Sequence, residues 1–280
     1  MLANEDLDLP GLRRVIERLM GSHVHGIFVL GTTGEFYALD DGEKQQVIAE
    51  AVQVVNKRGP VIAGTGAETT REAIRLTKMA AKEGADAVSV ITPYYISPTQ
   101  AEIADHYRRV ADSSTIPVML YNNPAVCGGV KIDIETVGRL AEHPNIIGAK
   151  DSSGDLQNLI EYIRVSNPAK FAVFQGRDTL IVPALQFGAA GAVPGTCNIA
   201  PDYCVGIYEA FRRGDVAAAQ ALQLKLSPLR LGLAIGTAPG AIKAAMNVLG
   251  QDVGPSRQPI APLSPDKQER LRGILKQMGL

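Results

Sequence analysis

The chain has 280 residues, of which 46% are hydrophobic, enough for a substantial core in one large α/β barrel or in two ordinary domains. Its 28 basic and 29 acidic residues give a formal net charge of -1, so no strong field would attract nucleic acid or an anionic membrane. We therefore expect a small neutral or modestly charged partner, and neither nucleic acid nor membrane.

Cysteine usage and the first residues indicate a cellular compartment. Cys127, Cys197 and Cys204 are an odd number in a long chain, which argues against a disulfide framework and favours a reducing environment. The acidic start "MLANEDLDLP" lacks the basic and apolar regions of a signal peptide, and no apolar run reaches membrane-spanning length. We expect a soluble, cytoplasmic protein.

Short apolar runs rich in β-branched residues recur along the chain, and helix-like stretches separate them. Continuous apolar runs are typical of strands buried on both faces, and their alternation with helices indicates parallel βα units. The runs begin near residues 26, 61, 86, 117, 146, 171 and 191. Apolar residues spaced three and four apart predict helices over residues 40–56, 70–84, 99–114 and 133–144.

Seven βα units predict a (β/α)8 TIM barrel with its first strand missing from this chain, because "MLANEDLD" before Leu9 has no strand pattern. Either the polypeptide begins upstream of Met1 or the fold departs from a complete barrel, and we favour the first. Helical patterns follow the seventh run over residues 202–215, 216–236, 238–250 and 264–279. We expect a barrel over residues 1–213 and a C-terminal helical extension over residues 214–280, packed on the barrel or on a neighbouring subunit.

Polar residues gather at the carboxyl ends of the predicted strands, where barrels of this kind build active sites. They are Thr32, Thr33, Glu35, Thr92, Tyr94, Tyr95, Tyr121, Asn122, Lys150, Asp151, Ser152, Arg177, Asp178, Thr196 and Asn198. A lysine, several tyrosines, a hydroxyl-rich glycine turn and an arginine form a set suited to carbonyl chemistry.

Lys150 ends the apolar run "NIIGAK" and allows two interpretations. A lysine at a strand end can carry its charge outward into solvent. A partly desolvated lysine is instead more readily neutral, and a neutral amine can attack a carbonyl carbon to form a Schiff base.

Three motifs carry a resemblance to a known family: "GTTGE" at 31–35, "YNNP" at 121–124 and "GAKDSSGD" at 148–155. From about Asp8 onward the chain resembles the pyruvate-dependent class I aldolases and lyases that include dihydrodipicolinate synthase and N-acetylneuraminate lyase. The resemblance implies that Lys150 attacks the keto carbon of pyruvate or of a 2-oxo acid, so that the covalent imine serves in place of a cofactor.

The same resemblance implies further roles. Tyr121 would be the proton shuttle, and Thr32 and Thr33 would hold the pyruvate carboxylate. Thr33 would also link Tyr121 to Tyr95, which in this family reaches into the active site of the neighbouring subunit. The backbone of Val193 would lie against bound pyruvate. Relatives are commonly homotetramers built as dimers of dimers, so we expect a homo-oligomer.

Each of these features also has a purely structural interpretation. Tyr95 and Tyr121 can simply cap the barrel with amphipathic rings, and the "GTTGE" turn can serve only to start the next helix. We assign Glu35 to structure, near the start of the following helix where its charge suits the helix dipole. "HVH" at 23–25 precedes its strand, so we expect no metal site there.

One departure from the family concerns the substrate. Dihydrodipicolinate synthases usually carry an arginine shortly after "YN.P" that binds the aldehyde substrate's carboxylate, and Val126 stands there instead. Arg177 and Asp178, in "QGRD", lie where the resemblance places substrate choice, although they can equally form an exposed ion pair.

We therefore expect cleavage of a 2-oxo acid, of the 4-hydroxy or 3-deoxy sugar acid type, into pyruvate and an aldehyde. The alternatives are dihydrodipicolinate synthase, which condenses pyruvate with aspartate semialdehyde, and a non-catalytic pyruvate-binding barrel.

Overall fold

The computed structural model of the protein describes residues 1–280. The chain forms two compact units. One consists of Met1–Gly59 together with Pro194–Leu280, and the other is the continuous segment Pro60–Val193. We call them the N/C unit and the central unit. No helix combines the length and the apolar character needed to cross a membrane.

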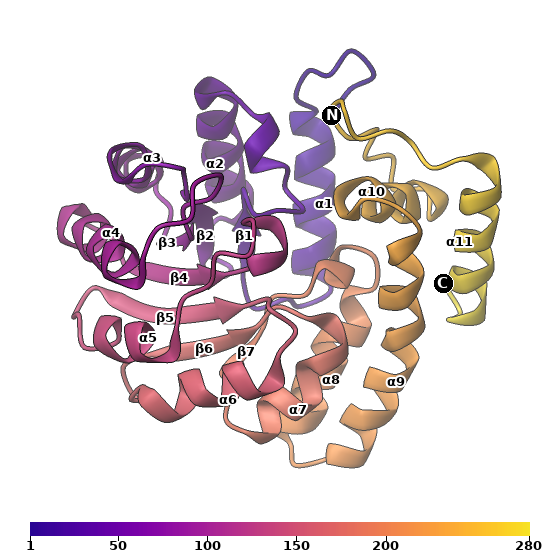
Figure 1. The fold of residues 1–280 in the computed structure, drawn as a ribbon. Helices are drawn as coiled ribbons and strands as arrows, with labels where there is room; N and C mark the ends of the chain where they lie inside the picture. Colours follow the sequence, from indigo (N-terminus) through magenta and orange to yellow (C-terminus); the bar gives the residue numbers. More distant parts are fainter. The chain divides into compact units, whose positions relative to one another are not determined.

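The central unit contains six parallel strands that are neighbours in the order in which they occur along the chain. They are β2 (Val61–Gly64), β3 (Ala87–Ile91), β4 (Val118–Asn122), β5 (Ile146–Asp151), β6 (Ala172–Gln175) and β7 (Gly191–Ala192). The helices between them are α3 (Thr70–Lys82), α4 (Gln100–Ser113), α5 (Ile134–Leu140), α6 (Leu156–Val165) and α7 (Ile181–Gln186). Figure 1 shows α3, α4, α5 and α6 along the outer side of these strands, which is the βα repeat of a barrel.

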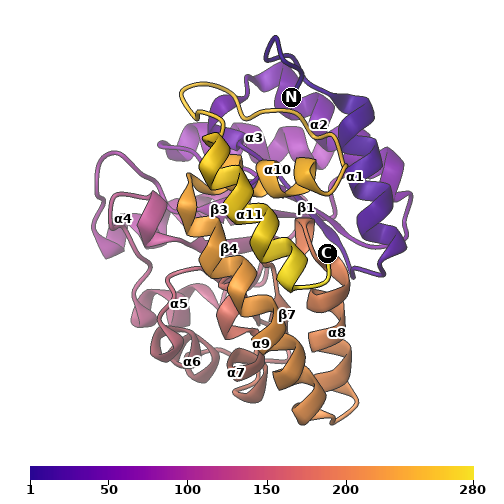
Figure 2. The same cartoon turned by 90° about the vertical axis from the view of Figure 1, so that its right-hand side faces the viewer.

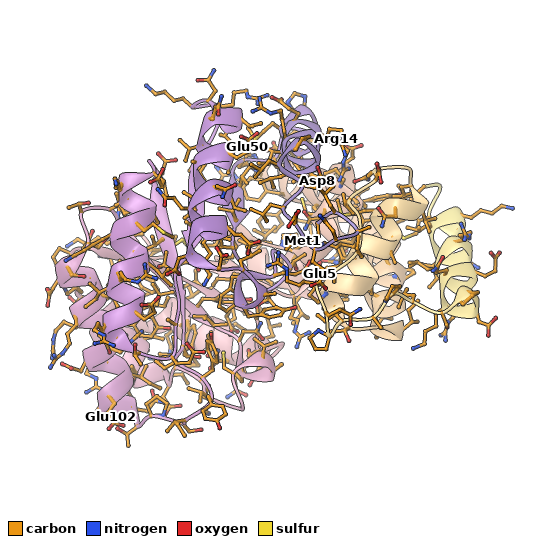
Figure 3. All side chains as sticks on the ribbon, turned by 90° about the horizontal axis from the view of Figure 1, so that it is seen from above. Met1, Glu5, Asp8, Arg14, Glu50 and Glu102 are labelled. Atoms are coloured by element: carbon orange, nitrogen blue, oxygen red, sulfur yellow. The ribbon has the colours of Figure 1, made fainter.

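The strands of the central unit form where the sequence is continuously apolar. Every residue of β3 and β4 is buried, as expected for parallel strands that are covered on both faces. Tyr107 of α4 is fully buried against β3, where its hydroxyl donates to the carbonyl oxygen of Val90 at 3.0 Å. Thr99 starts α4 through a capping box with Glu102, which Figure 3 labels.

The N/C unit joins the two ends of the chain. It contains α1 (Leu9–Gly21), β1 (Ile27–Val29), α2 (Asp41–Val55), α8 (Pro201–Arg212), α9 (Val216–Gly232), α10 (Ala238–Val248) and α11 (Pro265–Gln277). Figure 2 shows α9 and α11 side by side. The hydroxyl of Tyr203 in α8 donates to the carbonyl oxygen of Met278 at 2.8 Å, which fastens the end of α11.

Most predicted elements are present. All seven expected strands form, residues 1–8 contain no strand, and the four helices expected after the seventh strand are α8, α9, α10 and α11. Helices α1, α6 and α7 were not predicted from the sequence, and α7 has only six residues, with Pro183 among them. The boundary at residue 213 between barrel and extension stays a prediction.

Candidate active site

Lys150 lies in β5, one residue before the strand ends, and the parallel register pairs it with Tyr121 of β4. Lys150 is 8% exposed and Tyr121 is 4% exposed. The Nζ atom of Lys150 is 4.3 Å from the centroid of the Tyr121 ring, a distance at which an ammonium is attracted to the ring face. The lysine is buried against an aromatic ring, so the interpretation in which it extends into solvent is wrong.

The last residues of β4 and β5 are joined by side-chain hydrogen bonds directly after this pair. The side chain of Asn122 donates to Asp151 Oδ1 at 2.7 Å and accepts from the backbone N–H of Ile132 at 3.0 Å. Ser153 donates to the same carboxylate through its hydroxyl and its backbone N–H. Burial raises the pKa of Asp151 above its usual range, and these hydrogen bonds oppose the shift. Asn122 and Asp151 therefore hold the backbone directly after Tyr121 and Lys150.

Arg177 follows β6 and contacts the turn after Lys150. Its Nε donates to the carbonyl oxygen of Ser152 at 3.1 Å, and its backbone N–H donates to Gln175 Oε1 at 2.7 Å. Asp178 is buried at the start of a short 3-10 helix, so Arg177 and Asp178 do not form an exposed ion pair. The guanidinium is anchored beside the "KDSS" turn, which suits a contact to a substrate anion.

Gly176 allows the chain after β6 to lie close to Asp151 and Ser152, which follow Lys150. Its backbone N–H donates to the carbonyl oxygen of Asp151 at 2.7 Å. A Cβ at this position would overlap Ser152 Oγ and would lie 2.9 Å from Ser152 Cβ and 3.0 Å from the Asp151 carbonyl oxygen. Only a glycine therefore fits between the ends of β5 and β6.

Two further expected residues flank the central unit's strands. Val193 follows β7, and its backbone N–H donates to the carbonyl oxygen of Gln175 at 2.8 Å. Tyr95 follows β3 with a positive φ of 74° and is 92% exposed. Its neighbour Tyr94 is half-buried, and burial followed by a hydrogen bond to Glu68 raises the pKa of the Tyr94 phenol. Tyr95 thus projects outward into solvent.

The glycine turn at 31–35 belongs to the N/C unit. Leu30 and Glu35 both have a left-handed backbone, with φ of 57° and 54°, and Glu35 N–H donates to the carbonyl oxygen of Thr32 at 3.2 Å. Thr32 and Thr33 lie in the tight turn between these two positions. Glu35 is 2% exposed and forms an ion pair with Lys243 of α10, so its role is a buried charge pair rather than the helix-start contact that we expected.

Histidine and acidic side chains do not gather into a metal site. His25 Nε2 lies 3.0 Å from Glu209 Oε1 at the surface. No group of three or more His, Cys, Asp or Glu side chains is arranged to hold a metal ion.

The central unit thus brings together Lys150, Tyr121 and Arg177 with the end of β7 at Val193, whereas Thr32 and Thr33 belong to the N/C unit. Asn123, whose side-chain Nδ2 donates to Tyr121 Oη at 3.0 Å, was not among the residues predicted from the sequence. The motif "YNNP" contained the signal, because a second amide follows Tyr121 directly before a proline.

Known proteins resemble the chain over almost all of its length. The model of the dihydrodipicolinate synthetase family matches residues 1–278. A 4-hydroxy-tetrahydrodipicolinate synthase of Methanoculleus marisnigri is 42% identical over 273 residues, which are 98% of this chain and 93% of that protein.

Solved structures agree with the sequence comparison. A chloride-inhibited dihydrodipicolinate synthase from Acinetobacter baumannii, complexed with pyruvate, has a TM-score of 0.96 and 38% identity over 100% of this chain and 95% of its own. YagE from Escherichia coli K12, a prophage protein of the same family in complex with pyruvate, has a TM-score of 0.96 and 34% identity over 100% and 95% of the two chains. These similarities confirm the barrel class expected from the sequence, and the chain belongs to the dihydrodipicolinate synthetase family of class I aldolase-type lyases and synthases.

Proposed function

We propose that Lys150 forms a Schiff base with the keto carbon of pyruvate and that the derived enamine makes or breaks a carbon–carbon bond. The observation that carries this proposal is the burial of the Lys150 amine against the Tyr121 ring at the carboxyl end of parallel strands. Active sites of barrels lie at that end. A lysine amine in its neutral form is the nucleophile that attacks a carbonyl carbon.

The proposed chemistry is balanced by proton transfers. The neutral amine of Lys150 attacks C2 of pyruvate, and the carbinolamine loses water to give the imine. The protonated imine draws electrons from C3, so a methyl proton leaves and an enamine forms. Attack of the enamine on an aldehyde carbon forms the new bond, and water later releases the lysine. Tyr121 is the proposed carrier of these protons, and Thr32 and Thr33 are the proposed ligands of the carboxylate.

The relatives favour condensation over cleavage. Two of the three relatives described above are named as synthases, which supports the reaction of pyruvate with aspartate semialdehyde to give 4-hydroxy-tetrahydrodipicolinate. Our expectation from the sequence, cleavage of a 4-hydroxy or 3-deoxy sugar acid, is supported less well and becomes the second candidate. We retain cleavage as a candidate because of Val126, which is 49% exposed and stands where synthases usually have a carboxylate-binding arginine.

Intact mass after incubation with pyruvate and sodium borohydride tests the imine. We expect one pyruvate adduct on the wild type and none on Lys150→Ala. Lys170→Ala is the matched control, because Lys170 is an exposed lysine that precedes β6, and it should still form the adduct. A folded wild-type protein without an adduct would contradict the proposal.

Turnover then separates the candidates. Formation of the condensation product from pyruvate and aspartate semialdehyde supports the synthase. Release of pyruvate from 4-hydroxy or 3-deoxy 2-oxo acids, without condensation, supports cleavage. An adduct with no turnover of any of these substrates supports the non-catalytic pyruvate-binding barrel.

The proposed partners and cofactor follow from the same chemistry. Pyruvate or a 2-oxo acid is the proposed ligand, and the imine on Lys150 replaces a separate cofactor. The homo-oligomer, a tetramer formed as a dimer of dimers, stays a prediction that the exposed Tyr95 supports. Sedimentation of the wild type and of Tyr95→Ser would test it.

A further inference from the structure

The buried side-chain amide of Asn123 is hydrogen-bonded to the phenol oxygen of Tyr121, the proposed proton carrier. Asn123 Nδ2 donates to Tyr121 Oη at 3.0 Å, and both residues are buried. Hydrogen bonds between buried groups are not weakened by competing water and are costly to leave unmade. The contact is therefore a feature that the fold maintains, and neither the family motif nor the comparisons assign it a role.

The backbone around Tyr121 holds the two partners in place. Tyr121 is paired with Ile91 on one side and with Lys150 on the other, so its backbone is fixed within the sheet. Asn123 follows the strand with φ of -145° and ψ of 75°. Pro124 disfavours the helical conformation for the residue before it, and the backbone of Asn123 lies outside the helical region.

The consecutive residues Asn122 and Asn123 have different hydrogen-bond partners. Asn122 donates to Asp151 and accepts from the backbone of Ile132, which are contacts that close the ends of two strands. Asn123 instead directs its amide to the hydroxyl of Tyr121, whose ring centroid lies 4.3 Å from Lys150 Nζ. The first asparagine is structural, and the second contacts a group that the proposed chemistry uses.

We propose that Asn123 is a positioning residue that holds Tyr121 Oη as a hydrogen-bond acceptor and thereby directs its hydrogen toward a different partner. A phenol has one hydrogen and two lone pairs, so an amide donor on the oxygen selects the orientation of the hydroxyl. The same donor stabilises the negative charge that grows on the oxygen while the proton leaves. This inference rests on the proposed function, because Tyr121 carries protons only if Lys150 forms the imine.

The expected effect is on proton transfer and not on pyruvate binding. Replacing Asn123 with leucine keeps a similar volume and removes the donor. Since one such hydrogen bond changes a barrier by about one power of ten, the rate of imine formation should fall about tenfold. The KM for pyruvate should change by less than about twofold, because the amide contacts Tyr121 and not the carboxylate.

Asn123→Asp tests the direction of the hydrogen bond. Aspartate has nearly the shape of asparagine, but its ionised carboxylate only accepts. Tyr121 would then have to donate its hydrogen to residue 123, and imine formation should again be slow. If this variant formed the imine as fast as the wild type, the donor role of Asn123 would be overturned.

The measurement is a time course of borohydride trapping with pyruvate, followed by intact mass. It includes the wild type, Asn123→Leu, Asn123→Asp and the control Ala125→Ser, whose residue is exposed in the same segment and should leave the rate unchanged. Asn123→Leu is repeated in a Tyr121→Phe background. There it should have no further effect, because the group on which Asn123 acts is gone.

The outcomes separate this inference from the proposed function. Trapping of the wild type together with a wild-type rate in Asn123→Leu overturns the inference alone. An equal loss of rate in both backgrounds also overturns it, since a merely structural role acts with or without the phenol. No trapping of folded wild-type protein overturns the imine itself. If Asn123→Leu fails to fold, Asn123→Asp, which keeps the shape and polarity, decides the question.

Discussion

Lys243 of α10 lies 2.5 Å from Glu35, measured from Nζ to Oε1, and Glu35 is almost completely buried. The other carboxylate oxygen of Glu35 accepts from the backbone N–H of Arg257 at 3.0 Å. Lys243 also donates to the carbonyl oxygen of Pro255 at 2.8 Å. The end of the glycine turn is therefore tied to the C-terminal part of the N/C unit by a buried charge pair.

The beginning of the chain is tied to the same segment. Arg257 donates to the carbonyl oxygen of Glu5 and forms an ion pair with Glu43, with 2.7 Å between Nη2 and Oε1. Figure 3 labels Met1, Glu5 and Asp8 in this part of the N/C unit. Helices and loops from both ends of the chain thus meet around Glu35 and Arg257.

Replacing Lys243 with methionine should destabilise the protein. The change leaves the buried carboxylate of Glu35 without its counter-charge, and breaking a buried pair in this way costs about 3 kcal/mol. The measurement is the midpoint of urea unfolding, followed by circular dichroism. Lys267→Met on the exposed side of α11 is the control and should leave the midpoint unchanged.

The double variant Glu35→Gln with Lys243→Met separates the charge from the packing. A neutral amide still accepts from Arg257 N–H but carries no unpaired charge, so part of the lost stability should return. If the double variant were as unstable as the sum of two independent losses, the buried charge would not be the cause.

Gly176→Ala should destabilise the protein and impair the turn after Lys150. The new methyl group meets Ser152 Cβ and the carbonyl oxygen of Asp151, which belong to the backbone segment that follows the lysine. We expect a loss of about 2 kcal/mol, as for overpacking, together with slower trapping of pyruvate. Gly273→Ala in α11 is the control, because nothing lies within 4 Å of its added Cβ, and alanine favours the helix. Equal melting temperatures of Gly176→Ala and the wild type would contradict the close approach.

His106 should make stability fall in mild acid. Burial lowers the pKa of His106 to about 4 from an ordinary value near 6.5, although Asp105 opposes the shift. Between these two pH values the unfolded chain binds a proton that the folded chain does not. The free energy of unfolding therefore decreases as the pH falls through this window, by about 3 kcal/mol in all.

The control for His106 is another histidine. His106→Gln should flatten the dependence of the urea midpoint on pH between 6.5 and 4, whereas His23→Gln, at an exposed position, should not. The buried Nε2 of His106 has no hydrogen-bond partner, in keeping with a neutral ring. An unchanged pH dependence in His106→Gln would rule out this histidine as its source.

Tyr121→Phe should keep pyruvate binding and lose proton transfer. Phenylalanine preserves the ring that lies 4.3 Å from Lys150 Nζ but lacks the hydroxyl. General acid–base catalysis typically contributes a hundredfold or more, so turnover should fall by about two powers of ten while the KM for pyruvate changes little. Steady-state kinetics with saturating aldehyde measures the effect, and wild-type turnover in the variant would remove Tyr121 from the mechanism.

Val126→Arg should favour aldehydes that carry a carboxylate. An arginine at this exposed position can form a paired, bidentate contact that valine cannot. We expect kcat/KM to rise about tenfold for a carboxylate-bearing aldehyde and to stay unchanged for a neutral one. Val126→Gln, of similar length but uncharged, should show no such preference. An equal gain for both aldehydes would mean that residue 126 does not read the carboxylate.

Local sequence determined much of this protein. Continuous apolar runs predicted all seven strands, since a parallel strand buried on both faces needs apolar residues at every position. Their alternation with helices predicted the barrel class, and the position of Lys150 and Tyr121 at neighbouring strand ends followed from the fixed direction of parallel strands. Helix α7 was missed because it has only six residues, and a short helix is held by packing more than by its own pattern.

Tertiary structure decided the rest, because the remaining contacts join residues far apart in the chain or depend on how a side chain is oriented. The choice between a solvated and a buried Lys150 depended on the ring of a residue in another strand. The role of Glu35 depended on Lys243, more than two hundred residues away, which no local pattern near Glu35 indicates. Asn122 and Asn123 are adjacent residues of the same type, yet the side chain of Asn122 donates to Asp151 and that of Asn123 donates to Tyr121. Sequence periodicity predicts which residues are buried, but it does not say which buried group each of them meets.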